Sequence, residues 1–127
     1  MLRGGGLIMA FYELRVWQQA MSLALDIYRS TSHFPKHEAY GLTQQMRRAA
    51  VSIPSNIAEG KGYKSDRELS RFLCHARGSL QELHTQVILA KELQYLARTE
   101  AERLLELVAA VGRNLYALLN SIQEGVA

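Results

Sequence analysis

The sequence predicts an all-α protein whose architecture is an antiparallel up-down-up-down four-helix bundle. Apolar residues recur at alternating spacings of three and four over long segments, which is the period of a helix with one buried face. Only a few residues connect these segments, so consecutive helices must run antiparallel. Of the 127 residues, 48% are apolar, which supplies interior for one compact domain but not for two.

The first predicted helix covers residues 13–31 and has a broad apolar face. Its main stripe is Leu14, Trp17, Met21, Ala24 and Tyr28, and the stripe is widened by Val16, Ala20, Leu23 and Ile27. The helix should end before Pro35, because a proline disfavours helical backbone at the residue preceding it. The second helix is expected to begin near Ala39.

Pro54 lies inside the second predicted helix. Its missing N–H leaves the carbonyl of Ala50 without a partner and its ring clashes with that group, at a cost of about 3 kcal/mol in a helix interior. The sequence therefore predicts a kink at Pro54, with Ser52 and Ser55 hydrogen-bonding the loosened carbonyls. The alternative is a ligand-binding or catalytic role for the polar residues around the proline, Ser52, Ser55 and Asn56.

The third and fourth predicted helices have the most regular apolar seams. Residues 65–96 carry Leu69, Leu73, Ala76, Leu80, Leu83, Val87 and Ala90, and the last helix carries Leu104, Val108, Val111, Leu115, Leu118 and Ile122. Each helix should open with a capping box, Ser65 with Glu68 and Thr99 with Glu102. At about 1.5 Å per residue the third helix would be roughly 48 Å long, against about 28 Å for the first.

The overhang of the third helix predicts self-association. Phe72, Ile88 and Leu89 lie off its main seam, so a single bundle would leave some of this apolar surface for a partner subunit. We expect residues 11–127 to form the bundle and residues 1–10 to be a flexible tail, with Met9 a possible alternative start. Without an apolar run of membrane-spanning or signal-peptide length and with a single cysteine, the sequence predicts a cytoplasmic protein that does not engage a membrane.

Residue patterns for catalysis, metals and cofactors do not occur at helical spacing. Glu-x-x-His pairs, which build di-iron sites in bundles, are missing, and His75 and His84 point to opposite sides of their helix. Cys74 is expected to be a buried structural thiol. No Gly-rich phosphate loop or nucleophile with a neighbouring base is evident. We therefore expect a non-enzymatic protein with no cofactor and no metal.

Positive charge is concentrated in the middle of the chain. From residue 44 to residue 77, seven basic residues oppose three acidic ones, whereas from residue 78 onward four basic residues oppose six acidic ones. The seven are Arg47, Arg48, Lys61, Lys64, Arg67, Arg71 and Arg77. The end of the second helix and the start of the third share one pole of the bundle, where Arg15 joins them, while Glu100, Glu102 and Glu106 begin the last helix at the other pole.

A basic pole of this kind predicts binding to the phosphate backbone of RNA or DNA without base specificity. An ordinary solvated surface and an anionic protein partner remain the alternatives. Tyr63, beside the basic run, either stacks on a base or packs over the end of the bundle. Assembly around an axis would multiply a modest patch into a continuous positive ring.

Four stretches of the chain resemble a known family. They are "YELRVWQQAMSLALDIY", "FPKHEAYGLTQQMRRAAVSIPSNIAEG", "FLCHARGSLQELHTQVILAKELQYL" and "VGRNLYALLNSI". Together they are similar to the bacterial four-helix-bundle proteins encoded within intervening sequences of 23S ribosomal RNA genes, over residues 11–122. The most specific portion holds the arginine pair Arg47 and Arg48 and the neighbourhood of Pro54.

The resemblance implies a homopentamer, a barrel with a central channel. It also implies kinship with the accessory variability protein of diversity-generating retroelements, which binds nucleic acid and its reverse transcriptase through basic surface. The sequence thus supports two functions: a homo-oligomer that binds RNA or DNA backbone, and a protein-interaction scaffold such as a partner of a retroelement reverse transcriptase.

Overall fold

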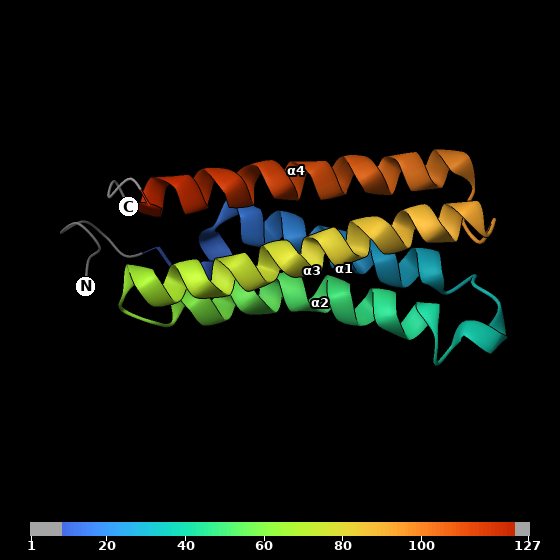
Figure 1. The fold of residues 1–127 in the computed structure, drawn as a ribbon, viewed down its shortest axis with the longest axis horizontal. Helices are drawn as coiled ribbons and strands as arrows, with labels where there is room; N and C mark the ends of the chain where they lie inside the picture. The colour runs from blue at the N-terminus through green and yellow to red at the C-terminus, as the bar shows by residue number, and fades with distance from the viewer. Residues whose placement is uncertain (1–8, 124–127) are drawn as a thin grey trace.

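A computed structural model describes residues 9–123, which form four α-helices and two short 3-10 turns (Figure 1). The helices are α1 (Arg15–Thr31), α2 (Leu42–Lys61), α3 (Asp66–Glu92) and α4 (Arg98–Gln123); the turns are η2 (Phe11–Glu13) and η3 (Lys36–Glu38). No strand occurs in the described part of the chain, so the predicted all-α class is confirmed. The tail predicted over the first ten residues falls mostly on residues 1–8, which lie outside the described range, as do residues 124–127.

The four helices lie along the long axis of the molecule, and each packs against two others (Figure 1). Helix α1 contacts α2 and α4, and α3 contacts the same two, most extensively α2. The turn between α2 and α3 lies at the end where α1 begins and α4 finishes, and the turn between α3 and α4 lies at the other end (Figure 1). None of the helices in residues 9–123 combines the length and the apolar character needed to cross a membrane.

The core follows the predicted seams in α3 and α4 more closely than in α1. All seven predicted seam residues of α3 are buried. In α4 the core also takes in Ala101 and Leu119, which were not predicted, while Leu118 is only half-buried. In α1 the buried apolar residues are Val16, Ala20, Leu23, Ala24 and Ile27. The main stripe predicted for α1 was therefore wrong at Met21 and Tyr28, which are exposed. The apolar stripe of this helix is so broad that the sequence does not reveal which of its residues face the core.

The ends of the long helices differ from the predicted capping boxes. Ser65 caps α3 by accepting a hydrogen bond from the Glu68 backbone N–H at 3.1 Å, while the Glu68 carboxylate pairs with Arg71. Helix α4 begins at Arg98, so Thr99 lies inside it and the second predicted capping box was wrong. The carboxylate of Glu102 instead accepts from Arg98 at 3.1 Å.

Helix α3 ends earlier than predicted, at Glu92. The Tyr95 N–H donates to the Ala90 carbonyl and the Gln94 N–H to the Lys91 carbonyl, both at 2.9 Å, which is a Schellman ending. Gln94 occupies the left-handed position of this Schellman motif, with a φ of 64°. The 27 residues of α3 make it about 40 Å long at about 1.5 Å per residue. Its Ile88 and Leu89 are exposed as predicted.

Helix α2 runs without interruption through Pro54, which is buried. The helix begins at Leu42, three residues later than predicted, because the segment before it forms η3. Gly60 lies near its end, where a Cβ would approach Leu69 Cδ1 and Phe72 Cβ to 3.0 Å. The absence of a side chain at this position is what lets α2 approach α3 so closely.

Candidate nucleic-acid interface

The basic pole lies where α2 ends and α3 begins. Lys64, Arg67 and Arg71 are exposed there, and Lys61 is half-buried. Within residues 9–123, neither Lys64 nor Arg67 makes an ion pair. Their charges are therefore directed to solvent, where a phosphate group can reach them.

Arg71 is less available than its neighbours at this pole. Its guanidinium donates to Glu68 Oε1 at 3.1 and 3.0 Å and lies 4.6 Å from the centre of the Phe72 ring. The Arg71 side chain is exposed and that of Glu68 is half-buried, and ion pairs at the surface contribute only about 0.2–1 kcal/mol. Arg71 thus adds positive charge to the pole, but its guanidinium also covers the Phe72 ring.

Tyr63 packs over the end of the bundle. Its ring is stacked on Phe72, with centroids 5.2 Å apart and an interplanar angle of 15°. Of the two roles predicted for Tyr63, packing is the one that the structure supports. The same contact explains why Phe72 is buried rather than left for a partner as predicted: Tyr63 and Arg71 cover it.

The paired arginines of α2 lie away from the basic pole and differ from each other. Arg47 donates from Nε to Thr31 Oγ1 at 2.9 Å and from Nη2 to the Tyr28 carbonyl at 3.2 Å, and its guanidinium lies 4.5 Å from the centre of the Tyr28 ring. It ties α2 to α1. Arg48 is exposed and makes no ion pair with any residue in the described range. Fourteen residues of helix, about 21 Å at about 1.5 Å each, separate Arg47 from Lys61.

The seven predicted basic residues are therefore distributed over more than one place. Lys61, Lys64, Arg67 and Arg71 lie together at the pole, Arg47 and Arg48 lie near the start of α2, and Arg77 is exposed in the middle of α3. Those with exposed charge and no ion pair inside residues 9–123 are Arg48, Lys64, Arg67 and Arg77.

The polar residues around Pro54 hydrogen-bond to one another and to α3. The Ser52 hydroxyl lies 2.8 Å from the Ser79 hydroxyl, and Asn56 Nδ2 donates to the Ser52 carbonyl at 2.8 Å and to its hydroxyl at 3.0 Å. Neither Ser79 nor Asn56 can remove a proton, so these contacts do not activate Ser52 as a nucleophile. Ser55 is exposed. The group serves to join α2 to α3.

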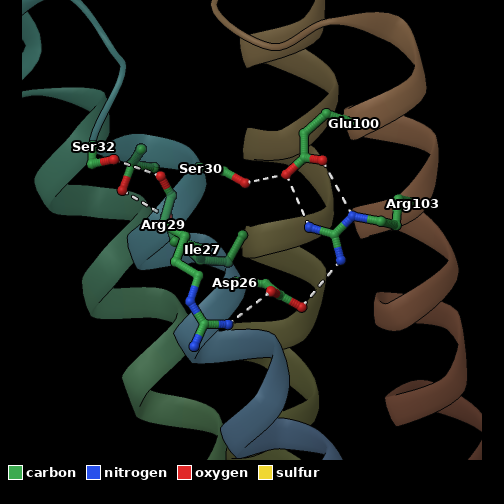
Figure 2. A network of polar contacts seen from close by, with 8 residues as sticks. Asp26, Ile27, Arg29, Ser30, Ser32, Glu100 and Arg103 are labelled. Atoms are coloured by element: carbon green, nitrogen blue, oxygen red, sulfur yellow. Dashed lines mark hydrogen bonds and ion pairs between the residues drawn. The ribbon is translucent and has the colours of Figure 1, made fainter.

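At the opposite pole, charged side chains are paired (Figure 2). Arg103 donates to Glu100 at 2.9 Å and to Asp26 at 3.2 Å, and Ser30 donates to Glu100. The contacts with Arg103 and then Ser30 lower the pKa of Glu100, and those with Glu100 and Asp26 raise the pKa of Arg103. This network joins α1 to α4 and pairs Arg103 with Asp26 and Glu100, whereas Lys64 and Arg67 at the other pole make no ion pair within residues 9–123.

Sequence reasoning missed a second contact at that end, made by Glu38. Its Oε1 accepts from the Leu42 N–H at 2.9 Å, and its Oε2 accepts from the Tyr95 hydroxyl at 2.8 Å. These two hydrogen bonds lower the pKa of Glu38, and the bond to the carboxylate raises the pKa of Tyr95. Glu38 thereby caps α2 from four residues away, a spacing that no capping box would have indicated.

A family model matches residues 12–117, and its description is "23S rRNA-intervening sequence protein". The chain belongs to this family. A crystal structure from Bacteroides thetaiotaomicron, described as a protein with unknown function from the S23 ribosomal protein family, matches with a TM-score of 0.74 and 19% identity. The match covers 82% of this chain and 97% of that one, and at this identity it shows a shared fold. A comparison with curated proteins finds no match.

In this member of the 23S rRNA-intervening sequence family, Cys74 differs from the prediction. The prediction of a buried thiol was wrong, because Cys74 is exposed on the outer side of α3. His33 and His37, in the turn after α1, are exposed. Over residues 9–123, no three or more His, Cys, Asp or Glu side chains gather in a way that could hold a metal ion.

Proposed function

We propose that this family member is a non-enzymatic, cytoplasmic protein that assembles with copies of itself and binds the phosphate backbone of RNA or DNA. In this proposal the monomer is an up-down-up-down bundle bent at Pro54, and the copies close into a ring, a homopentamer. The observation that carries the binding function is the contrast between the poles. Lys64 and Arg67 are exposed and have no carboxylate partner among residues 9–123, whereas Arg103 is neutralised by Asp26 and Glu100.

Backbone phosphates suit this arrangement because the interaction is electrostatic and needs no base contact. A cation already paired with a carboxylate must break that pair before it can bind a phosphate, and Lys64 and Arg67 avoid this cost. Arg71 can contribute after releasing Glu68, since their ion pair lies at the surface and is weak. Ring assembly would bring one such pole from each copy to the same side and multiply the charge.

The test is binding of labelled, mixed-sequence RNA and DNA at low salt, measured by fluorescence anisotropy. Lys64→Glu/Arg67→Glu should abolish binding at concentrations where the native protein saturates. Lys36→Glu/Arg113→Glu is the matched control, because it makes the same change in net charge at two exposed residues away from this pole. The proposed function fails if the native protein does not bind, or if the two double variants lose affinity equally.

Self-association is supported by apolar side chains exposed on two separate surfaces. Phe11, Met21, Leu25 and Tyr28 border a groove of about 490 Å³ between α1 and α2. Ile88, Leu89 and Leu93 form a second exposed set at the end of α3. Two different apolar surfaces on one chain allow head-to-tail contacts, which close into a ring when the rotation permits.

Molar mass in solution, measured by light scattering after gel filtration, tests the assembly. The native chain should elute as an oligomer. Leu25→Glu, which puts a charge into the groove, should shift it toward the monomer. Ser22→Glu should not, because Ser22 lines the hollow between α1 and α4 and not this groove. A native monomer would refute the ring.

A protein-interaction scaffold is the second candidate, and the same α1–α2 groove favours it. In that case the groove receives a different protein, such as the reverse transcriptase of a retroelement. The native chain would then be monomeric by itself, and a partner captured from its host would remain bound after nuclease treatment. Leu25→Glu would release that partner while Ser22→Glu would retain it.

A further inference from the structure

We propose that the hollow beside the start of α2 binds one nucleotide of single-stranded RNA or DNA, with its base stacked on Tyr40 and its phosphate held by Arg48. This inference rests on the proposed function and adds a preference for unpaired strands. The hollow has a volume of about 520 Å³, within the range of about 300–1,000 Å³ usual for small-molecule sites. Its lining includes Tyr28, Tyr40, Gln44, Arg47, Arg48 and Ser52.

Tyr40 offers an aromatic ring that the fold does not use. It is 92% exposed, the highest exposure among the large apolar side chains of residues 9–123. Aromatic side chains usually contribute to folding by the area they bury, and Tyr40 buries almost none. Tyr63, by contrast, already stacks on Phe72. A base that stacks on this protein would therefore find an open ring at Tyr40 rather than at Tyr63.

Two arginines supply positive charge to the same hollow in different ways. Arg47 is fixed by its bonds to Thr31 and to the Tyr28 carbonyl, and it lies over the Tyr28 ring, so its charge is held in place before any ligand arrives. A fixed group loses little conformational entropy on binding. Arg48 is exposed and has no ion pair within the described residues, so its guanidinium is open to a phosphate.

The lining of this hollow selects for an anion. No acidic residue in the described part of the chain lines it. Two other hollows of the same chain do contain a carboxylate, Glu82 in one and Glu100 in the other. Gln44 adds a neutral amide that can donate to and accept from the polar edge of a base.

An exposed ring beside cations fits an unpaired strand better than a duplex. Bases in a single strand can turn outward and stack on an aromatic side chain, whereas bases in a duplex are already stacked on each other. Duplex DNA or RNA would reach only the cations, including Lys64 and Arg67 at the pole. The two sites therefore recognise different features of a nucleic acid. The pole binds phosphate charge alone, whereas the hollow binds a phosphate together with an unpaired base.

The experiment compares a fluorescent single-stranded oligonucleotide with its duplex by anisotropy at low salt. Tyr40→Ala should weaken single-strand binding by about 5- to 150-fold, the range expected when one stacking ring is lost, and leave duplex binding unchanged. Tyr40→Phe should retain native affinity, and Arg48→Gln should weaken the single strand more than the duplex. Tyr116→Ala is the matched control, because Tyr116 is 59% exposed on α4.

Three outcomes overturn the inference. Equal single-strand affinity for Tyr40→Ala and the native protein would do so, as would an equal loss on both nucleic acids. In either case binding that still depends on Lys64 and Arg67 would leave the proposed function intact. If neither nucleic acid binds the native protein, the proposed function fails and this inference fails with it. Circular dichroism checks that Tyr40→Ala keeps the native helix content.

Discussion

Replacing Gly60 by alanine should destabilise the protein, although the same change in an open helix position should stabilise it. Gly60 lies in the last turn of α2 and is buried against α3. A Cβ there would approach Leu69 Cδ1 and Phe72 Cβ to 3.0 Å and the Leu69 carbonyl oxygen to 3.4 Å. The Leu69 methyl can move away, but Phe72 Cβ is attached directly to the backbone, so α3 itself has to shift.

The sign of the effect follows from two opposing terms. Glycine costs a helix up to about 1 kcal/mol relative to alanine, and less near a helix end, so the substitution gains at most that amount. Inserting a methyl group into a close-packed contact costs about 1–3 kcal/mol. With a gain of about 0.5 kcal/mol in this last helical turn, we expect Gly60→Ala to lower the free energy of unfolding by roughly 0.5–2.5 kcal/mol.

Two other glycines of the same chain serve as controls. A Cβ at Gly78 would meet nothing within 4 Å, and one at Gly112 would meet Leu80 Cδ2 at 3.5 Å, an ordinary contact. Gly78→Ala should therefore raise the free energy of unfolding by about 1 kcal/mol, and Gly112→Ala should raise it by a smaller amount. Urea unfolding followed by circular dichroism, at one protein concentration, measures all three variants. The reasoning is wrong if Gly60→Ala is as stable as Gly78→Ala.

Three further predictions concern the ends of α3, the core and acid stability. Gln94→Gly should stabilise by about 0.5–1 kcal/mol, because glycine adopts the positive φ of this position without strain; an unchanged melting temperature would contradict this. Leu83→Ala, at a position with no exposed area, should cost about 2–5 kcal/mol in urea unfolding, and a smaller loss would mean that the core is looser than described. The pKa values of Glu38 and Glu100 are lowered in the fold, so the stability they contribute is present above their ordinary pKa of 4.5 and is lost as pH falls through the lower folded values. Melting temperatures should therefore decline below about pH 4.5, and Glu38→Gln should decline less, whereas parallel profiles would refute the assignment.

The fold could be predicted because its seams are local and periodic. The seam of α3 recurs at helical spacing for seven residues, and each of them is buried. In α1 the apolar stripe is wider than the buried face, so the sequence could not distinguish Leu23, which is buried, from Met21, which is exposed. That choice depends on where α2 and α4 lie, and periodicity within one helix carries no such information.

For the candidate site, the sequence predicts which basic residues are present but not how they are arranged in space. The concentration of positive charge in the middle of the chain is visible in the sequence. Its division between the basic pole and the surface around Arg48 arises because Arg48 lies near the start of α2 and the pole lies at its end. The roles of Arg47 and Tyr63 as packing residues came from partners in other elements, Thr31 and Phe72. The exposed ring of Tyr40 gave no signal, because an exposed and a buried tyrosine look alike in a sequence.

The dependence of nucleic-acid affinity on salt tests the central claim most directly. If two to four exposed cations of each chain bind phosphates, the logarithm of the association constant for a single strand should fall against the logarithm of salt with a slope of about −1.4 to −2.8. Neutralising the two cations by Lys64→Gln/Arg67→Gln should make that slope shallower by about 1.4, and Lys36→Gln/Arg113→Gln should leave it as it is. A native slope near zero, or the same slope for both double variants, would contradict the claim that the pole binds the phosphate backbone.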